Sequence, residues 1–323
     1  RNSGTWVGVG LPFASGKPAD ACFRERTDAG IDGLCLDLTP AADGVAAFTL
    51  TVDDPPRETA SRISGSNWSL SAESAACYFR NRFFRLNVSR SKGGRILGLF
   101  AGDGEHSLLG RNRIYTDRGI VPGRKDSQSG KELAVTASSE EDLEAELRIG
   151  RNRNEITLGF SGTLRNSYWN WKYPANPRIP YRLSYELGPE NSVRVRGAAV
   201  PTVDSPSLDA FLAYTLAVPD VRSATVTAAG KSTAFDCAKQ APGVRFALSP
   251  QPPERIVLTR KDGTKLRFSE LATPAGQRFF LIRNGAGELV IVFALFDGVP
   301  AAYHGEAREF SYTVGVFPPG KGK

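Results

Sequence analysis

Two apolar runs flank a glycine-rich turn in the segment Arg278-Phe279-Phe280-Leu281-Ile282-Arg283-Asn284-Gly285-Ala286-Gly287-Glu288-Leu289-Val290-Ile291-Val292-Phe293-Ala294-Leu295-Phe296. Aromatic and β-branched residues dominate both runs, and such residues favour extended strands. Asn and Gly between the runs tolerate the backbone conformations that a tight reversal needs. The segment therefore predicts a β-hairpin, with Arg278 to Arg283 as one strand and Glu288 to Phe296 as the other.

The same two-residue alternation continues over much of the chain. Its clearest runs are residues 47–52, 85–89, 155–160, 181–187, 192–197 and 310–316, with turn-forming residues at 92–94, 189–191 and 261–263. Only Ser139 to Leu147, with acidic residues at its start, has the pattern of a helical turn, and a strand edge is the alternative there. Short strands every 8 to 12 residues or so predict an all-β fold of stacked antiparallel sheets. No repeat that would indicate a propeller or solenoid is evident.

Three interruptions divide this strand pattern. Residues 102–130 are rich in Gly, Arg and Asp, and residues 166–180 are rich in aromatics and Pro, so both segments are expected to be functional loops. A Pro- and Ser-rich stretch between Asp54 and Ser66 has the composition of a linker. We therefore predict an N-terminal β module over residues 1–64 and a larger β domain over residues 65–323.

The charge of the chain excludes some partners. The 323 residues carry a formal net charge of +7, and arginine supplies most of the positive charge. The arginines are spread along predicted strands without zinc-finger spacing or an RNP motif, so no nucleic-acid partner is predicted. Guanidinium groups bind carboxylate or sulfate in a bidentate manner, so an acidic polysaccharide fits the charge, as does a simple solvated surface. The longest apolar run, Leu289 to Phe296, is too short for a membrane span.

The four cysteines have two interpretations. Cys22, Cys35, Cys77 and Cys237 lack the spacing of a zinc site or a redox pair, so no metal is predicted. Two disulfides, Cys22–Cys35 and Cys77–Cys237, are one interpretation, and buried free thiols are the other. The chain contains no methionine and begins like a processed protein. We expect it to be secreted or periplasmic.

Several strand pairs carry a resemblance to a known superfamily. They are Tyr78 to Val88 with Lys92 to Phe100, Tyr181 to Leu187 with Ser192 to Arg196, and the last strand, Glu309 to Val314. In strand rhythm and turn placement, residues 65–318 resemble galactose-mutarotase-like β-supersandwich domains. Residues 6–12 look like the small β module that precedes such domains in some polysaccharide lyases. The resemblance implies an antiparallel β-supersandwich with a small N-terminal β module.

The resemblance also implies a role with carbohydrate. The superfamily includes mutarotases, sandwich domains of polysaccharide lyases and noncatalytic sugar-binding domains. Mutarotases use two histidines and a late glutamate, whereas this chain has only His106 and His304, and no matching glutamate motif accompanies them. This difference argues against a sugar epimerase. A polysaccharide lyase and a noncatalytic sugar-binding domain remain as alternatives.

Two segments contain residue types suited to eliminating a uronic acid. His106 precedes an arginine-rich stretch, and His304 stands in Tyr303-His304-Gly305-Glu306. In β-elimination an arginine neutralises the sugar carboxylate, a His or Tyr removes the neighbouring proton, and a Tyr or His protonates the leaving oxygen. The predicted catalytic residues are His106, Arg113, Tyr303 and His304. The predicted substrate-binding residues are Arg111, Tyr115, Arg118, Trp169, Trp171, Tyr173 and Glu306.

Other surfaces could also meet a saccharide. Trp169 and Trp171 share one side if their segment is extended, so sugar rings could stack on them. Arg80 with Arg82, and Arg194 with Arg196, alternate in the same way. Each pair could line a groove for an acidic ligand or simply face solvent.

The function predicted from the sequence is therefore a lyase that cleaves a uronate-containing polysaccharide. A noncatalytic glycan-binding protein is one alternative. A glycoside hydrolase that uses two of the carboxylates Asp103, Glu105 and Glu306 is another. The chain contains no dinucleotide fingerprint, Walker A loop, HExxH or GxSxG motif, and no cofactor is predicted.

Overall fold

A computed structural model describes residues 22–28, 31–37, 61–65, 67–125, 132–152, 154–165, 179–200, 208–297 and 306–319. By its internal contacts the chain divides into two compact units. Of the smaller unit, residues 1–59 and 167–174, the structure describes the antiparallel hairpin of β1 (Cys22–Asp28) and β2 (Ile31–Asp37). The larger unit contains every other described element. The domain boundary after residue 64 stays a prediction.

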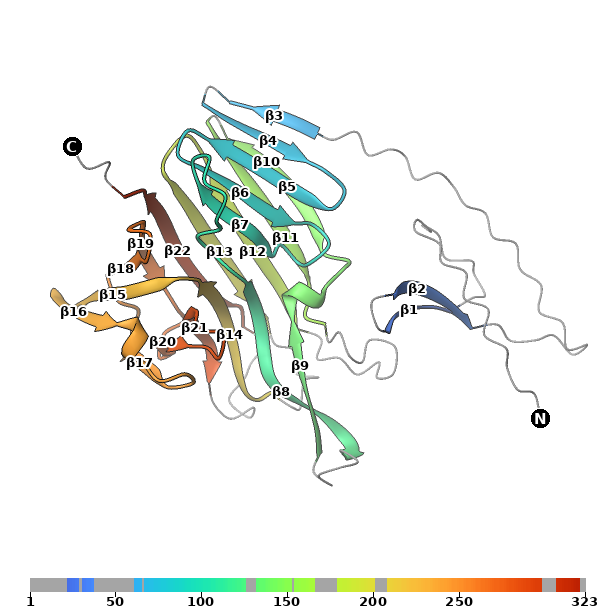
Figure 1. Cartoon of the computed structure of the whole chain (residues 1–323). Helices are drawn as coiled ribbons and strands as arrows, with labels where there is room; N and C mark the ends of the chain where they lie inside the picture. The colour runs from blue at the N-terminus through green and yellow to red at the C-terminus, as the bar shows by residue number, and fades with distance from the viewer. Residues whose placement is uncertain are drawn as a thin grey trace, which may run out of the picture. The chain divides into compact units, whose positions relative to one another are not determined.

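The larger unit contains a nine-stranded sheet in which neighbouring strands are antiparallel (Figure 1). Its order is β10 (Glu146–Asn152), β11 (Glu155–Thr163), β12 (Pro180–Leu187), β13 (Ser192–Ala199), β22 (Arg308–Phe317), β19 (Lys265–Ala272), β18 (Arg255–Arg260), β15 (Val221–Ala228) and β16 (Lys231–Asp236).

Two further antiparallel sheets complete this unit. The six-stranded sheet has the order β17 (Arg245–Ser249), β20 (Phe279–Arg283), β21 (Leu289–Asp297), β14 (Leu208–Val218), β8 (Asn112–Lys125) and β9 (Glu132–Ser138). The five-stranded sheet runs in sequence order through β3 (Ser61–Ser64), β4 (Trp68–Ala72), β5 (Ala76–Asn81), β6 (Phe84–Ser89) and β7 (Ile96–Ala101). The predicted hairpin is confirmed as β20 and β21.

Helical structure in the described residues is confined to two short 3-10 turns, η1 (Ser139–Glu141) and η2 (Cys237–Lys239). The helical turn predicted from Ser139 is therefore present but ends at Glu141, and β10 follows it. The prediction of an all-β fold of stacked antiparallel sheets is confirmed. No described helix is long and apolar enough to cross a membrane.

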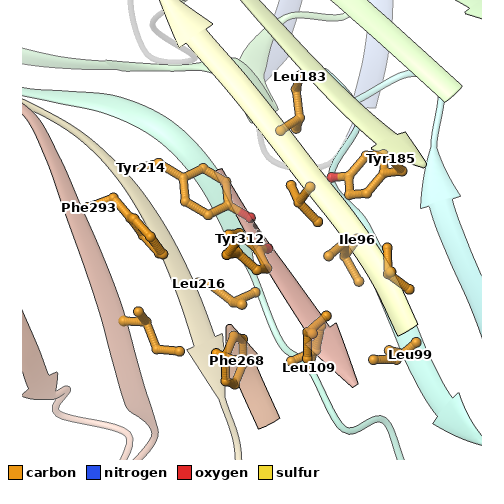
Figure 2. Close-up of a cluster of buried hydrophobic side chains, with 14 of the residues drawn as sticks. Ile96, Leu99, Leu109, Leu183, Tyr185, Tyr214, Leu216, Phe268, Phe293 and Tyr312 are labelled. Atoms are coloured by element: carbon orange, nitrogen blue, oxygen red, sulfur yellow. Dashed lines mark hydrogen bonds between the residues drawn. The ribbon is translucent and has the colours of Figure 1, made fainter. Parts of the chain in front are cut away.

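One hydrophobic core joins the three sheets of the larger unit. Figure 2 shows side chains from the five-stranded sheet (Ile96), the nine-stranded sheet (Tyr185, Tyr312) and the six-stranded sheet (Tyr214, Phe293) in this cluster. The hydroxyls of Tyr214 and Tyr312 lie 2.7 Å apart, and the nine-stranded and six-stranded sheets are thus bonded face to face.

Strand alternation then decides which side chains point away from this core. On β13, Val193 and Val195 are buried in the core, so Arg194 and Arg196 lie on the outer face of the nine-stranded sheet. On β8, Ile114 is buried in the core, so its neighbour Arg113 lies on the outer face of the six-stranded sheet. Because the two sheets pack through their inner faces, these arginines lie on opposite outer faces of the sandwich.

The cysteines differ from one of the two interpretations of the sequence. Cys77 and Cys237 are free thiols buried in the core, so the predicted disulfide between them is wrong. Burial raises the pKa of each thiol to about 11. In the smaller unit, Cys22 lies opposite Asp37 and Cys35 lies opposite Arg24 in the strand register. The side chains of Cys22 and Cys35 lie outside the described residues.

Candidate functional site

Three arginines surround one buried carboxylate next to β8. Glu140 is 3% exposed, and it accepts a hydrogen bond from Arg111 Nε at 2.6 Å while Arg111 Nη2 contacts its second oxygen. Arg113 Nη1 lies 3.3 Å from the carboxylate, and Arg95 Nη1 lies 3.7 Å from it. We call Arg95, Arg111, Arg113 and Glu140 the Glu140 cluster.

The local fold explains why these groups meet. Residues alternate along the chain into β8, so Arg111 and Arg113 point away from the buried Asn112 and Ile114. Strand β9 pairs with β8 and leads directly into η1, which brings Glu140 beside them. The Ser139 hydroxyl accepts a hydrogen bond from the Ile114 amide at 3.1 Å and fixes this turn against β8.

The Glu140 cluster has more positive than negative charge. One carboxylate faces three guanidinium groups, and the Arg111 side chain remains 48% exposed. Burial lowers the pKa of Arg111, and the neighbouring charges of Arg113 and Arg95 lower it further, whereas the charge of Glu141 acts in the opposite direction. Three guanidinium groups thus stand against two carboxylates. An incoming carboxylate or sulfate would relieve this repulsion, so the cluster can bind an anionic group at its exposed side.

A phenol and an apolar surface adjoin the Glu140 cluster. The Arg113 guanidinium carbon lies 4.6 Å from the centre of the Tyr115 ring, which is a cation–π contact. The Tyr115 ring also packs against a small hydrophobic cluster of Ala213, Phe280 and Val292. The outer face of β8 therefore combines guanidinium groups, a hydroxyl that can donate or accept a proton, and an apolar surface.

The predicted site residues are brought together only in part. Arg111, Arg113 and Tyr115 lie side by side as described above. His106 is exposed in the turns after β7, and no hydrogen bond or ion pair links it to a described residue. Glu306 is exposed just before β22, and Arg118 lies within β8 with its side chain outside the described residues. Trp169, Trp171, Tyr173, Tyr303 and His304 also lie outside the described residues.

Two members of the site escaped the sequence prediction. The sequence marks Glu140 only as an acidic residue at the start of a helical turn, and Arg95 only as part of a predicted strand pair. A pattern that could have pointed to the site is the alternation in Arg111-Asn112-Arg113-Ile114-Tyr115, which places three long polar side chains on one face. Within the described ranges, no three His, Cys, Asp or Glu side chains lie close enough to hold a metal ion.

Comparisons with known proteins show distant likeness in structure. No protein-family model and no curated protein sequence matches the chain. It is similar to the galactose 1-epimerase from Lactobacillus acidophilus NCFM, with 10% identity and a TM-score of 0.46 over 80% of this chain and 97% of that one. It is also similar to a heparinase III (9% identity, TM-score 0.38, 85% of this chain and 37% of that one).

A third similar structure is the heparan sulfate lyase from Pedobacter heparinus. The identity is 11% and the TM-score 0.35, over 87% of this chain and 39% of that one. The chain thus spans less than half the length of either lyase. An epimerase and polysaccharide lyases are among the groups of proteins that the sequence resemblance names.

Proposed function

We propose that the protein acts on carbohydrate, that the saccharide carries carboxylate groups, and that the Glu140 cluster holds one of them. The observation that carries this proposal is the excess of guanidinium groups over carboxylate in the cluster, with Arg111 half exposed. Arginine suits this task because its planar fork matches the two oxygens of a carboxylate and stays charged at any physiological pH.

The reaction we propose is β-elimination from a uronate. An arginine pairs with the C6 carboxylate and stabilises the negative charge that develops when the C5 proton leaves. A base takes this proton, the electron pair forms the C4–C5 double bond, and the C4–O bond breaks. The leaving oxygen then takes a proton from an acid. The products are an unsaturated uronate and a shortened saccharide with a free hydroxyl.

Tyr115 is our first candidate for one of the two proton transfers, because its ring is stacked with Arg113. The sequence proposes His106, Tyr303 and His304 for the other transfer. Of these, Tyr303 and His304 stand a few residues before β22 in the sequence, and the two histidines are tested by substitution below. We also propose a secreted or periplasmic location, which fits a polymeric substrate and which fractionation of the native host would check.

The experiment is a lyase assay with alginate, polygalacturonate and hyaluronan, in which the absorbance of the unsaturated uronate is measured over time. Tyr115→Phe keeps the ring beneath Arg113 and removes only the hydroxyl, and we expect its rate to fall at least about 100-fold. Tyr78→Phe is the matched control, because Tyr78 is an exposed tyrosine on the five-stranded sheet. His106→Ala and His304→Ala test the second proton transfer.

Each outcome decides between functions. No absorbance change with any uronate would refute the lyase and favour a glycan-binding protein, which calorimetry with the same polymers would detect. Reducing ends without the absorbance change would indicate a hydrolase. Equal rates for Tyr115→Phe and Tyr78→Phe would remove Tyr115 from the reaction, and full activity in both histidine variants would remove His106 and His304.

A further inference from the structure

The outer face of the nine-stranded sheet contains a groove lined by five arginines and two glutamates. Its volume is about 960 Å³, and its lining residues belong to β10 to β13, to β22 and to the end of β19 with the residues after it. The arginines are Arg148, Arg182, Arg194, Arg196 and Arg308. We call this surface the basic groove. Because Arg194 and Arg196 point away from the core, the basic groove lies on the opposite side of the sandwich from the Glu140 cluster.

Strand register produces the width of the basic groove. Arg148 on β10 lies opposite Gly159, Gly159 opposite Ser184, and Ser184 opposite Arg196 on β13. A glycine and a serine thus form a low floor between two arginines that are three strand spacings apart, roughly 14 Å. This backbone spacing is much wider than one carboxylate. The spacing fits a chain that carries several anionic groups and lies across the strands.

Some of these guanidinium groups remain available to a ligand. Arg182 is exposed and forms no ion pair with any described residue. Arg196 is 55% exposed, and its shortest contact with Glu186 is through Nε, at 3.2 Å. The two arginines belong to neighbouring strands, and each offers terminal nitrogens to an anion. Arg148 pairs with Glu146, and Arg194 pairs with Glu186 and Glu270. The donors of Arg182 and Arg196 therefore give the basic groove its complementarity to a polyanion.

A β-bulge and two hydrogen bonds hold Glu270 in a fixed position at one wall of the basic groove. β19 contains a bulge between Ser269 and Ala272, and Glu270 within it has a φ of 54°, which is unfavourable for a residue with a side chain. The carboxylate accepts hydrogen bonds from Arg194 and from the Thr313 hydroxyl, at 2.5 and 2.7 Å, and these bonds lower its pKa. The bulge thus aims Glu270 at Arg194 and fixes that guanidinium in place.

We infer that the basic groove is a second saccharide site, which binds a stretch of an acidic polysaccharide across β10 to β13, separately from the Glu140 cluster. That the ligand is a saccharide rests on the proposed function. That it is polyanionic rests on the spacing and the charge of the basic groove alone. A nucleic acid is the other polyanion to be tested.

The experiment measures binding to the full chain by calorimetry, with alginate, heparin, dextran and a single-stranded oligonucleotide as probes. Arg182→Ser/Arg196→Ser removes the two available guanidinium groups. Its matched control is Arg255→Ser/Arg267→Ser, which removes two exposed arginines from β18 and β19, outside the groove lining. We expect alginate or heparin to bind the groove variant at least about tenfold more weakly than the wild type, and the control variant within about twofold of it. Arg182→Lys/Arg196→Lys, which keeps the charge but not the fork, should recover part of the loss.

Four results would overturn the inference. The first is no binding of either acidic polysaccharide to the wild type, or equal binding to the groove variant. The second is an equal loss of affinity in the control variant, which would show that only the net charge of the protein matters. The third is tighter binding of the oligonucleotide than of both polysaccharides. Binding of dextran as tight as that of alginate would also contradict a site built on charge.

Failure of the proposed function is distinguishable from failure of this inference. If the lyase assay detects no product, binding in the basic groove can still be measured with the same polymers. If both are correct, Arg182→Ser/Arg196→Ser weakens polymer binding but still cleaves a short uronate oligosaccharide, whereas Tyr115→Phe binds the polymer and fails to cleave it.

Discussion

The hydroxyl pair of Tyr214 and Tyr312 predicts that removing both hydroxyls destabilises the protein less than removing one of them. Both side chains are fully buried, and their hydroxyls lie 2.7 Å apart between the six-stranded and nine-stranded sheets. Tyr214→Phe keeps the ring that stacks on Phe310 at 4.1 Å but leaves the Tyr312 hydroxyl without a partner among the described residues. A buried hydroxyl left unpaired costs about 1–3 kcal/mol, and we expect the free energy of unfolding to fall by that amount.

The second substitution should restore much of this loss. In Tyr214→Phe/Tyr312→Phe no hydroxyl of the pair remains to be satisfied, and replacing both partners by apolar groups of the same shape can be nearly neutral. Asn112, which also bonds to the Tyr214 hydroxyl, keeps its hydrogen bond to the Tyr185 hydroxyl at 2.9 Å. We therefore expect the double variant to lie within about 1 kcal/mol of the wild type and to be more stable than Tyr214→Phe. Urea unfolding of the three proteins measures the difference, with equal m-values as the control. A double variant less stable than Tyr214→Phe would refute the argument.

Three further predictions concern other buried groups. Glu140→Gln removes the shared counter-charge of three partly exposed arginines, and urea unfolding should show a loss of about 2 kcal/mol in the free energy of unfolding. A loss near zero would contradict the cluster's structural role. Burial raises the pKa of Cys77 and Cys237 to about 11, above the unfolded value of about 8.5, so the two thiols contribute fully to stability below about pH 8.5 and lose this contribution as pH rises through about 11. In thermal melts, the melting temperature of Cys77→Ala/Cys237→Ala should therefore fall less at alkaline pH than that of the wild type. An equal fall would contradict this prediction. Gly197→Ala places a Cβ 2.3 Å from a core ring and should lower the free energy of unfolding by about 1–3 kcal/mol, as measured by thermal unfolding. In the control Gly159→Ala the nearest atom lies 3.6 Å from the new Cβ, and stability should change by less than about 1 kcal/mol. Equal effects would show that the core rearranges to accept the extra methyl group.

The strands could be predicted because their cause is local. A strand with one face in a core must place apolar residues at every second position, and turns require Gly, Asn or Pro at particular points. The β20–β21 hairpin therefore follows from residues 278–296 alone. The same alternation predicted that Arg194 and Arg196 share a face, as β13 shows.

Partners across the sheets could not be predicted in this way. Glu140 meets Arg95 from 45 positions away and Arg111 from 29, because β9 pairs with β8 and not because of any local pattern. The disulfide prediction was wrong for the same reason. Cys77 and Cys237 each fit the apolar side of a strand or turn, but only the packing of the sheets decides whether two such thiols meet.

The two arginine surfaces follow from one structural rule, and that rule makes them independent. Alternation turns Arg113 outward from β8 and Arg196 outward from β13, while Ile114 and Val195 are both buried in the common core. A saccharide unit bound at the Glu140 cluster is therefore separated from the basic groove by the full thickness of the sandwich, about 10 Å between the backbones of the two sheets. Substitutions on one face should leave the other unchanged, because energies of distant sites without shared partners add. Cleavage and polymer binding should accordingly respond to separate sets of arginines, and a variant of the basic groove that abolished cleavage of a short substrate would show that the two faces are coupled through the core.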